Sequence, residues 1–198
     1  MDLFSVKHGF GEETSLAVKL LDKVSKLIDC CLISGTLLGY VRHCSFIPWD
    51  DDMDVLASES QRSIIENIHE LTVIKTNDYV YKVSFKDKPF PFVDIFLYII
   101  NENIHFFHKT WNISDFLEFH KVQFMGIEVH IPQNPHVFLQ RCYPNYLTTL
   151  KSSTFNHRTI KPHTSFATLH DVPPELVNNC DELNKLVKSV TKRTYRRL

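Results

Sequence analysis

Residues 35–43 read GTLLGYVRH, and residues 47–55 read IPWDDDMDV. The small residues of the first stretch are typical of a tight turn whose backbone can approach a ligand. In the second stretch, an extended backbone turns alternate side chains to one face, so we expect Asp50, Asp52 and Asp54 to share a face. Like charges crowded together repel unless a cation neutralises them, and hard carboxylate oxygens suit Mg²⁺ or Mn²⁺. The two stretches together indicate a metal-dependent phosphate site.

The acidic run has simpler explanations that have to be weighed against a metal site. Taken alone, an acidic run is as well explained by a solvated loop. A calcium-binding EF-hand loop that starts at Asp50 needs Gly in its sixth position and Glu in its twelfth. These positions hold Val55 and Gln61, which excludes the calcium loop. Asp51 points to the opposite face, and we exclude it from the metal set.

A further carboxylate stands inside an apolar run, FVDIFL at residues 92–97. Burying Asp94 in such a strand is costly unless it has a partner, which makes it the candidate third acid of the site. The alternative is a strand-edge residue that faces water. Gly35 supplies a turn, and backbone N–H groups at the start of a helix from Thr36 can bind phosphate oxygens. These parts meet the requirements of phosphoryl or nucleotidyl transfer.

Hydrophobic periodicity predicts an α+β fold. Apolar residues recur at helical spacing in some segments and alternate in others, and Pro and Gly separate them. Ser58 and Gln61 form the pattern of a helix-capping box. The expected elements are helices over 13–29, 36–43, 58–70, 135–141 and 181 to about 190, strands over 31–33 and 53–56, and hairpins formed by 79–85 with 92–100 and by 121–124 with 127–131.

Size and charge restrict the classes of partner. The chain of 198 residues is long enough for one domain with its own core. Its 22 Lys and Arg against 23 Asp and Glu give a net charge of -1, so we expect neither a nucleic-acid surface nor a membrane surface. Residues 1–11 show no signal-peptide pattern, and no apolar run suits a membrane span.

The five cysteines are odd in number and contain no C-x-x-C pair. This pattern speaks against a zinc ribbon or a disulfide framework, so we expect reduced and mostly buried thiols. A metal site built from Cys30, Cys31 and Cys44 is a minor alternative, because these residues bracket the glycine turn.

The run G-T-L-L-G-x-x-R-H followed by I-P-W-D-D-D-x-D resembles the LicD family, which includes bacterial phosphorylcholine transferases, fukutin and fukutin-related protein. V-D-I-F at residues 93–96 and the G-I-E-V to I-P segment at residues 126–132 add to the resemblance, which spans about residues 32–146. It implies a nucleotidyltransferase-like mixed β-sheet flanked by helices. We expect a single domain over 1–198, with core motifs in 31–146 and a C-terminal helical tail over 175–198.

The resemblance also implies roles for individual residues. Gly35 and Thr36 correspond to the phosphate-binding turn; Asp50, Asp52 and Asp54 correspond to the metal-binding acids; Asp94 corresponds to the third acid. Asp52, Asp54 and Asp94 are thus the candidate catalytic residues.

Two basic residues are candidates for the donor phosphates. Arg42 falls on the arginine of the family, where a phosphate contact and a surface salt bridge are equally good explanations. Lys82 can reach a donor phosphate or be an exposed strand lysine. Residues 143–146 read YPNY where family members often have Y-G-x-x-W, and this departure concerns the acceptor side.

The implied activity is a metal-dependent transfer of a phospho-alcohol, such as phosphocholine, ribitol phosphate or glycerol phosphate. The donor is CDP-activated, and the acceptor is a carbohydrate or other hydroxyl compound. Two alternatives stay open: an NTP-dependent nucleotidyltransferase, and a non-catalytic relative that binds nucleotide or glycan. We expect a cytoplasmic protein, or one of the Golgi or another secretory lumen, where related eukaryotic enzymes work.

Overall fold

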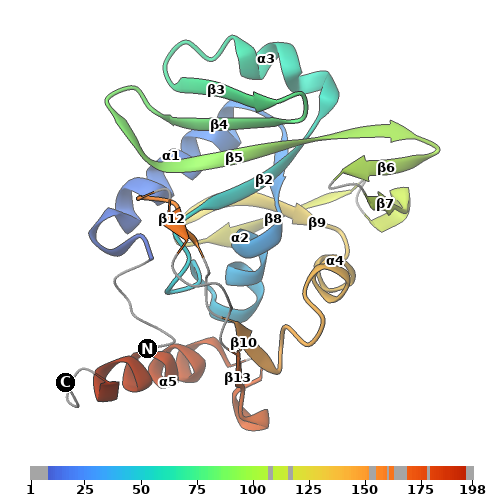
Figure 1. The fold of residues 1–198 in the computed structure, drawn as a ribbon. Helices are drawn as coiled ribbons and strands as arrows, with labels where there is room; N and C mark the ends of the chain where they lie inside the picture. The colour runs from blue at the N-terminus through green and yellow to red at the C-terminus, as the bar shows by residue number, and fades with distance from the viewer. Residues whose placement is uncertain are drawn as a thin grey trace.

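The computed structural model describes residues 9–106, 109–115, 118–151, 155–159, 161–162, 169–177 and 179–194. Its centre is a mixed seven-stranded sheet in which five strands follow the order β1-β2-β5-β4-β3, while β6 pairs with β5 and β7 pairs with β6 (Figure 1). The fold is therefore α+β, as the sequence predicts. The strands are β1 (Cys30–Leu32), β2 (Met53–Ser58), β3 (Thr72–Asn77), β4 (Val80–Phe85), β5 (Lys88–Asn101), β6 (Asn103–Phe106) and β7 (Lys109–Trp111).

Strands β2 and β5 form the parallel pair at the centre of the sheet. Their register places Asp54 opposite Asp94, while β4 pairs antiparallel with β5 and places Lys82 on the other side of Asp94. Asp94 therefore lies in a central strand and not at a sheet edge. Behind this sheet in Figure 1, α1 (Thr14–Leu27) follows the short helix η1 (Gly11–Glu13) and buries its apolar stripe. The fully buried stripe residues are Ala17, Leu20, Leu21 and Val24.

The two predicted hairpins are present. Strands β4 and β5 form the first hairpin. Strands β8 (Phe119–Phe124) and β9 (Ile127–Pro132) form the second, in a separate two-stranded sheet. The turn of the second consists of Met125 and Gly126, both with positive φ, which suits the right-handed twist of the strands. The predicted helix that follows is α4 (Pro135–Cys142).

The helix predicted over 58–70 begins near its predicted start but ends early, at Glu66. Only η3 (Glu59–Gln61) and the five-residue α3 (Arg62–Glu66) form there, and β3 begins at Thr72. The capping box is absent as well. The Ser58 hydroxyl accepts from the Ser60 N–H, while the Gln61 side chain accepts from the Asp29 N–H. Strand β3 escaped prediction because most of its residues are polar and exposed at the edge of the sheet.

The helix predicted from Thr36 begins earlier. Helix α2 (Ser34–Leu38) continues as the π-helix η2 (Gly39–His43). Ser34, with a φ of 50°, takes the left-handed conformation at the turn, so Gly35 is already the second helical residue. The turn predicted at Gly35 is thus made by its neighbour.

The described residues of the C-terminal part form short strands and a long helix. The strands pair as β10 (Thr149–Lys151) with β13 (Leu169–Asp171) and β11 (Phe155–Asn156) with β12 (Lys161–Pro162). Helix α5 (Cys180–Thr194) starts and ends close to the predicted limits and follows η5 (Pro174–Leu176). A further short helix, η4 (Ile113–Asp115), follows β7.

A disulfide joins Cys44, directly after η2, to Cys180 in α5. This bond contradicts the prediction that the cysteines are reduced, and it excludes a metal site made of Cys30, Cys31 and Cys44. Cys30 and Cys31 are free and buried in the core, as predicted. The disulfide closes across a sequence separation of 136 residues, and so distant a pairing leaves no local pattern for sequence reasoning.

Candidate active site

Three carboxylates converge at the centre of the sheet. Oxygen atoms of Asp52, Asp54 and Asp94 lie within 4.8 Å of one another, and we call these residues the carboxylate cluster. Asp54 and Asp94 meet because β2 and β5 run parallel in register, and Asp52 precedes β2 on the same face as Asp54. The structure therefore brings Asp94 to Asp52 and Asp54, as the sequence predicts, while their catalytic and metal-binding roles stay predictions.

The carboxylate cluster carries negative charge that the protein compensates only in part. Burial and the charges of Asp52 and Asp94 raise the pKa of Asp54, while Lys82 and a hydrogen bond from the Gly35 backbone offset part of this effect. Burial also raises the pKa of Asp94 against the lowering effect of Lys82. Groups in such surroundings favour either a proton or a cation. Three hard oxygen donors fit Mg²⁺ or Mn²⁺ by their chemistry.

Asp50 lies beside the carboxylate cluster rather than within it. Burial, followed by the charges of Asp52 and Asp54 and a side-chain hydrogen bond with Asp52, raises its pKa well above the usual range. Its carboxylate rests against Gly35, where a Cβ atom would stand 2.4 Å from Asp50 Oδ2. A side chain at position 35 would therefore displace the Asp50 carboxylate from its present place. The role of Asp50 as a metal ligand stays a prediction.

Thr36 and Lys82 hold members of the carboxylate cluster in place. The Thr36 hydroxyl accepts from the Asp54 N–H at 2.8 Å. Lys82 Nζ lies 2.9 Å from Asp94 Oδ1 and 3.1 Å from the centre of the Phe92 ring. Its side chain is 31% exposed, so Lys82 is a partly buried strand lysine that is paired with Asp94, and a contact with donor phosphate stays a prediction.

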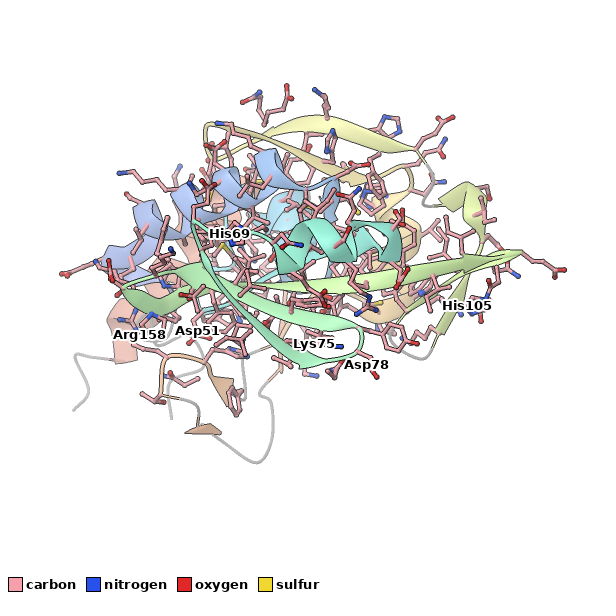
Figure 2. All side chains as sticks on the ribbon, turned by 90° about the horizontal axis from the view of Figure 1, so that it is seen from above. Asp51, His69, Lys75, Asp78, His105 and Arg158 are labelled. Atoms are coloured by element: carbon pink, nitrogen blue, oxygen red, sulfur yellow. A yellow bond between two sulfur atoms is a disulfide. The ribbon has the colours of Figure 1, made fainter. Side chains whose placement is uncertain are left out.

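Asp51 points away from the carboxylate cluster, as predicted, and is bound by protein groups. Its carboxylate accepts from the backbone N–H groups of His157 and Arg158 and contacts His157 Nδ1 at 2.7 Å. His157 Nε2 lies 3.4 Å from Asp52 Oδ2, so the imidazole connects Asp51 to the carboxylate cluster. Figure 2 shows Asp51 and Arg158 on one side of the sheet, near each other.

The surroundings of His157 have opposing effects on its pKa. Burial lowers its pKa, but the hydrogen bond to Asp51 and the charge of Asp52 outweigh burial and raise the pKa above the usual value. Asp51, Asp52 and His157 form a second group whose ligand atoms could hold a metal ion. Sequence reasoning missed His157 because it lies in a segment without periodicity, far along the chain from the aspartates.

A cavity of about 490 Å³ opens beside these acids. Tyr143 lines it, and so do residues of α2, residues of the segment 47–54, which we call the aspartate loop, and residues of the segment that contains His157. The YPNY departure at residues 143–146 therefore lies at the site. Trp49 also lines the cavity, is buried, and donates from Nε1 to the Lys151 carbonyl at 2.9 Å, which agrees with a packing role.

Comparison with known proteins places the sequence in a family. The family model described as "LicD/FKTN/FKRP, nucleotidyltransferase domain" matches residues 27–134, more than half of the chain. The chain belongs to the LicD family. The match contains β1, α2, the aspartate loop and β5, so the carboxylate cluster lies within the matched part of this LicD domain.

Two individual proteins are also similar to this LicD-family chain. An uncharacterized protein of Rickettsia prowazekii (strain Madrid E) is 31% identical over 133 residues, which cover 57% of this chain and 46% of the relative. The chain thus spans about half the length of that relative. The crystal structure of ANT(2″)-Ia in complex with adenylyl-2″-tobramycin aligns with a TM-score of 0.43 and 14% identity, over 94% of this chain and 98% of that one.

Arg42 of the LicD domain is buried, so the predicted alternative of a surface salt bridge is wrong. Its guanidinium donates to the Tyr146 carbonyl at 2.8 Å and to His43 Nε2 at 3.0 Å. Burial lowers the pKa of Arg42 to about 10, against the opposing charge of Asp50. Arg42 also lines the cavity, so a phosphate contact stays a prediction alongside this fixed role in holding residues 143–149.

His43 supports the same corner of the LicD domain. Burial and the charge of Arg42 lower the pKa of His43 to about 3, so the ring is neutral. Because Nε2 accepts from Arg42, Nδ1 carries the proton and donates to Asn184 Oδ1 of α5. Asn184 in turn donates to the His43 carbonyl. Helix α5 is therefore fixed to η2 by these bonds as well as by the disulfide.

The LicD domain brings together most of the residues that the sequence singled out. Asp52, Asp54 and Asp94 form the carboxylate cluster, and Gly35, Thr36 and Lys82 contact it. Membership of this family makes the chain a nucleotidyltransferase-domain protein. Among the described residues, no helix is both long enough and apolar enough to cross a bilayer.

Proposed function

We propose that this LicD-family chain transfers a phospho-alcohol from a cytidine-diphosphate donor to a hydroxyl acceptor and releases CMP. The observation that carries the proposal is the carboxylate cluster beside a cavity large enough for a small nucleotide-linked donor. Family membership supports a nucleotide-activated substrate. The choice of phosphocholine, ribitol phosphate or glycerol phosphate rests on the resemblance to family members.

Asp52, Asp54 and Asp94 would hold Mg²⁺ or Mn²⁺, because their oxygens converge and their negative charge is only partly compensated. When bound, such a cation supplies neutralisation of the charge that develops on phosphate oxygens during phosphoryl transfer. Side chains of the protein hold the metal-binding carboxylates in position. Lys82 fixes the Asp94 carboxylate through its ion pair, and Thr36 fixes the backbone of Asp54.

Asp94 has a second possible task, which is to accept the proton of the attacking hydroxyl. Its raised pKa brings it closer to the working range of a general base than an ordinary aspartate. If Asp94→Asn loses turnover but keeps its Mn²⁺ affinity, the result supports Asp94 as the proton acceptor. Loss of both turnover and Mn²⁺ affinity in this variant supports a role of Asp94 as a metal ligand.

The test of the function begins with a thermal-shift screen of CDP-choline, CDP-ribitol, CDP-glycerol, CTP and UTP, each with and without Mn²⁺. We expect a CDP-alcohol to raise the melting temperature most when Mn²⁺ is present. CMP release from that donor is then measured for the wild type and Asp54→Asn, with Asp87→Asn as a control at an exposed turn. Undiminished CMP release in Asp54→Asn contradicts the assignment.

A second candidate function is nucleotidyl transfer from an NTP. The description of the matched family as a nucleotidyltransferase domain favours it. The two functions differ in their products, because the first releases CMP from CDP-alcohols and the second releases pyrophosphate from NTPs. The function is decided by the assay in which the wild type releases product and Asp54→Asn does not.

The compartment is also a proposal. Structural disulfides persist in oxidising compartments, so the Cys44–Cys180 bond supports a secretory lumen or another oxidising location over the cytoplasm. Alkylation of the thiols in intact cells, followed by a gel-shift assay, measures the oxidised fraction. A fully reduced protein favours the cytoplasm.

A further inference from the structure

His157 lies in the segment 155–159, beyond the part of the chain that the family model matches. Contacts with other parts of the chain hold this segment in place. The Arg158 guanidinium donates to the Phe10 carbonyl at 3.3 Å and stands 4.4 Å from the centre of the Phe90 ring. The backbone that carries His157 is therefore anchored next to the carboxylate cluster.

The imidazole of His157 is itself held by several contacts. Its Nδ1 atom lies 2.7 Å from the Asp51 carboxylate. The centre of the ring is 4.9 Å from that of Phe155 and 5.8 Å from that of Phe92, which meets it edge to face. The side chain of His157 is only 25% exposed. A ring locked in this way by packing and a hydrogen bond holds its second nitrogen, Nε2, at a defined place.

This second nitrogen faces one member of the carboxylate cluster. His157 Nε2 lies 3.4 Å from Asp52 Oδ2. The other two members are held by the sheet, because Asp54 lies in β2 and Asp94 lies in β5. Asp52 precedes β2 and lies outside the paired strands. His157 is thus placed to orient the member of the cluster that the sheet does not carry.

His157 could instead bind a cation itself, or serve only to fix the fold. Asp51, Asp52 and His157 present ligand atoms within 4.8 Å of one another. The oxygens of Asp51, however, already accept from Nδ1 of the ring and from two backbone N–H groups, which makes this group a poor metal site. A purely structural role needs Nδ1 alone and leaves the approach of Nε2 to Asp52 without a purpose. Outer partners that orient a metal ligand, in contrast, typically change metal affinity by about 10–100-fold.

We propose that His157 is a positioning residue, which holds the Asp52 carboxylate in the orientation that a cation at the carboxylate cluster requires. Its catalytic meaning rests on the proposed function, but the effect on metal affinity is measurable without any turnover.

Two substitutions separate the two nitrogens of the imidazole. His157→Asn places an amide near the position of Nδ1, so it keeps a donor for Asp51 but has no atom at the position of Nε2. His157→Gln is longer by one carbon, so its amide reaches Asp52 at the expense of the bond to Asp51. His69→Asn, at an exposed turn before β3, is the matched control. Mn²⁺ affinity by electron paramagnetic resonance, thermal unfolding in EDTA and CMP release are measured with the full chain.

We expect His157→Asn to melt near the wild-type temperature and to bind Mn²⁺ at least about tenfold more weakly. Its kcat should fall while KM for the CDP-donor changes little, because a metal ligand loses its orienting contact and the donor cavity keeps its lining. His157→Gln should melt at a lower temperature, because buried Asp51 loses a partner, and should keep more Mn²⁺ affinity than His157→Asn. His69→Asn should behave like the wild type.

Pulsed electron paramagnetic resonance of the Mn²⁺-loaded wild type distinguishes positioning from ligation. We expect no nitrogen bound directly to Mn²⁺. A directly bound nitrogen that disappears in His157→Asn makes His157 a ligand and overturns the proposal.

Wild-type Mn²⁺ affinity in folded His157→Asn also overturns the positioning role, as does a wild type that binds no Mn²⁺. If His157→Asn does not fold, His157→Gln decides, because an affinity at least about tenfold below that of the wild type contradicts the proposal. Failure of the proposed function looks different. The wild type then binds Mn²⁺ but releases no CMP, while the weaker Mn²⁺ binding of His157→Asn still supports positioning.

Discussion

Asp51 and Asp54 stand three residues apart in one acidic run and lie in contrasting surroundings. Asp51, with a side chain 2% exposed, is bound by His157 Nδ1 and by the backbone N–H groups of His157 and Arg158. Asp54 faces Asp52 and Asp94, and these like charges raise its pKa beyond the effect of burial. The protein satisfies one acid with its own donors and places the other against like charges.

The difference separates structural from functional carboxylates. A buried carboxylate with several donors fixes the segments that supply those donors, here residues 155–159 beside the cavity. A carboxylate facing other carboxylates lowers stability unless a cation binds. Substitutions at the two positions should therefore have opposite effects on stability and activity.

The largest effect is expected for Asp54→Asn, which should reduce turnover of the CDP-donor by about a thousandfold or more, because a lost cation ligand removes several kcal/mol of stabilisation from the transition state. The metal-free variant should be as stable as the wild type or more stable, since one of the repelling charges is gone. Initial rates and thermal unfolding in EDTA measure the two quantities. Equal turnover, or a clear loss of metal-free stability, contradicts a functional role.

Asp51→Ala should show the reverse pattern. It leaves the buried donors of His157 and Arg158 without their acceptor, so the free energy of unfolding should fall by about 3 kcal/mol. Denaturant titration measures this loss, and Asp87→Asn at the exposed turn serves as the control. If Asp51→Ala is as stable as the wild type, Asp51 does not have the structural role that we assign to it.

Gly35 and Gly39 offer a matched pair within α2 and η2. A Cβ at Gly39 would stand 2.6 Å from the Ser45 carbonyl oxygen, so Gly39→Ala should cost about 2 kcal/mol of stability through a backbone clash. A Cβ at Gly35 meets the end of the Asp50 side chain, which can rotate. Gly35→Ala should therefore spare stability and lower turnover. Chemical unfolding and CMP release separate the two, and identical profiles refute the distinction.

The smallest effect concerns pH. Because the pKa values of Asp50 and Asp54 are raised in the folded protein, the folded state holds more protons than the unfolded state above about pH 4. This contribution to stability is present below the ordinary carboxyl pKa and is lost as pH rises through the raised values. Metal-free wild type should lose stability relative to Asp54→Asn as pH rises toward neutrality, by about 1 kcal/mol. A constant difference between the two across this range contradicts the pKa directions.

Local sequence patterns were sufficient to predict much of the fold and of the candidate site. The alternation that separates Asp51 from Asp52 and Asp54 follows from strand geometry, and Asp94 stood out as an acid in an apolar strand. Both hairpins were predictable from turn-forming residues between alternating segments.

The features that escaped prediction depend on contacts between distant segments. His157 reaches Asp51 across 106 residues, and Arg42 reaches the Tyr146 carbonyl across 104. The disulfide partners are 136 residues apart. No local period encodes such pairings.

Direct Mn²⁺ binding, followed by electron paramagnetic resonance, shows whether Asp54 is a metal ligand and Asp51 is not. The wild type, Asp54→Asn and Asp51→Asn are titrated under identical conditions, with circular dichroism to verify folding. We expect Asp54→Asn to lose Mn²⁺ affinity at least about tenfold, while folded Asp51→Asn binds like the wild type. Wild-type affinity in Asp54→Asn, or loss of affinity in Asp51→Asn alone, would contradict the division between functional and structural acids.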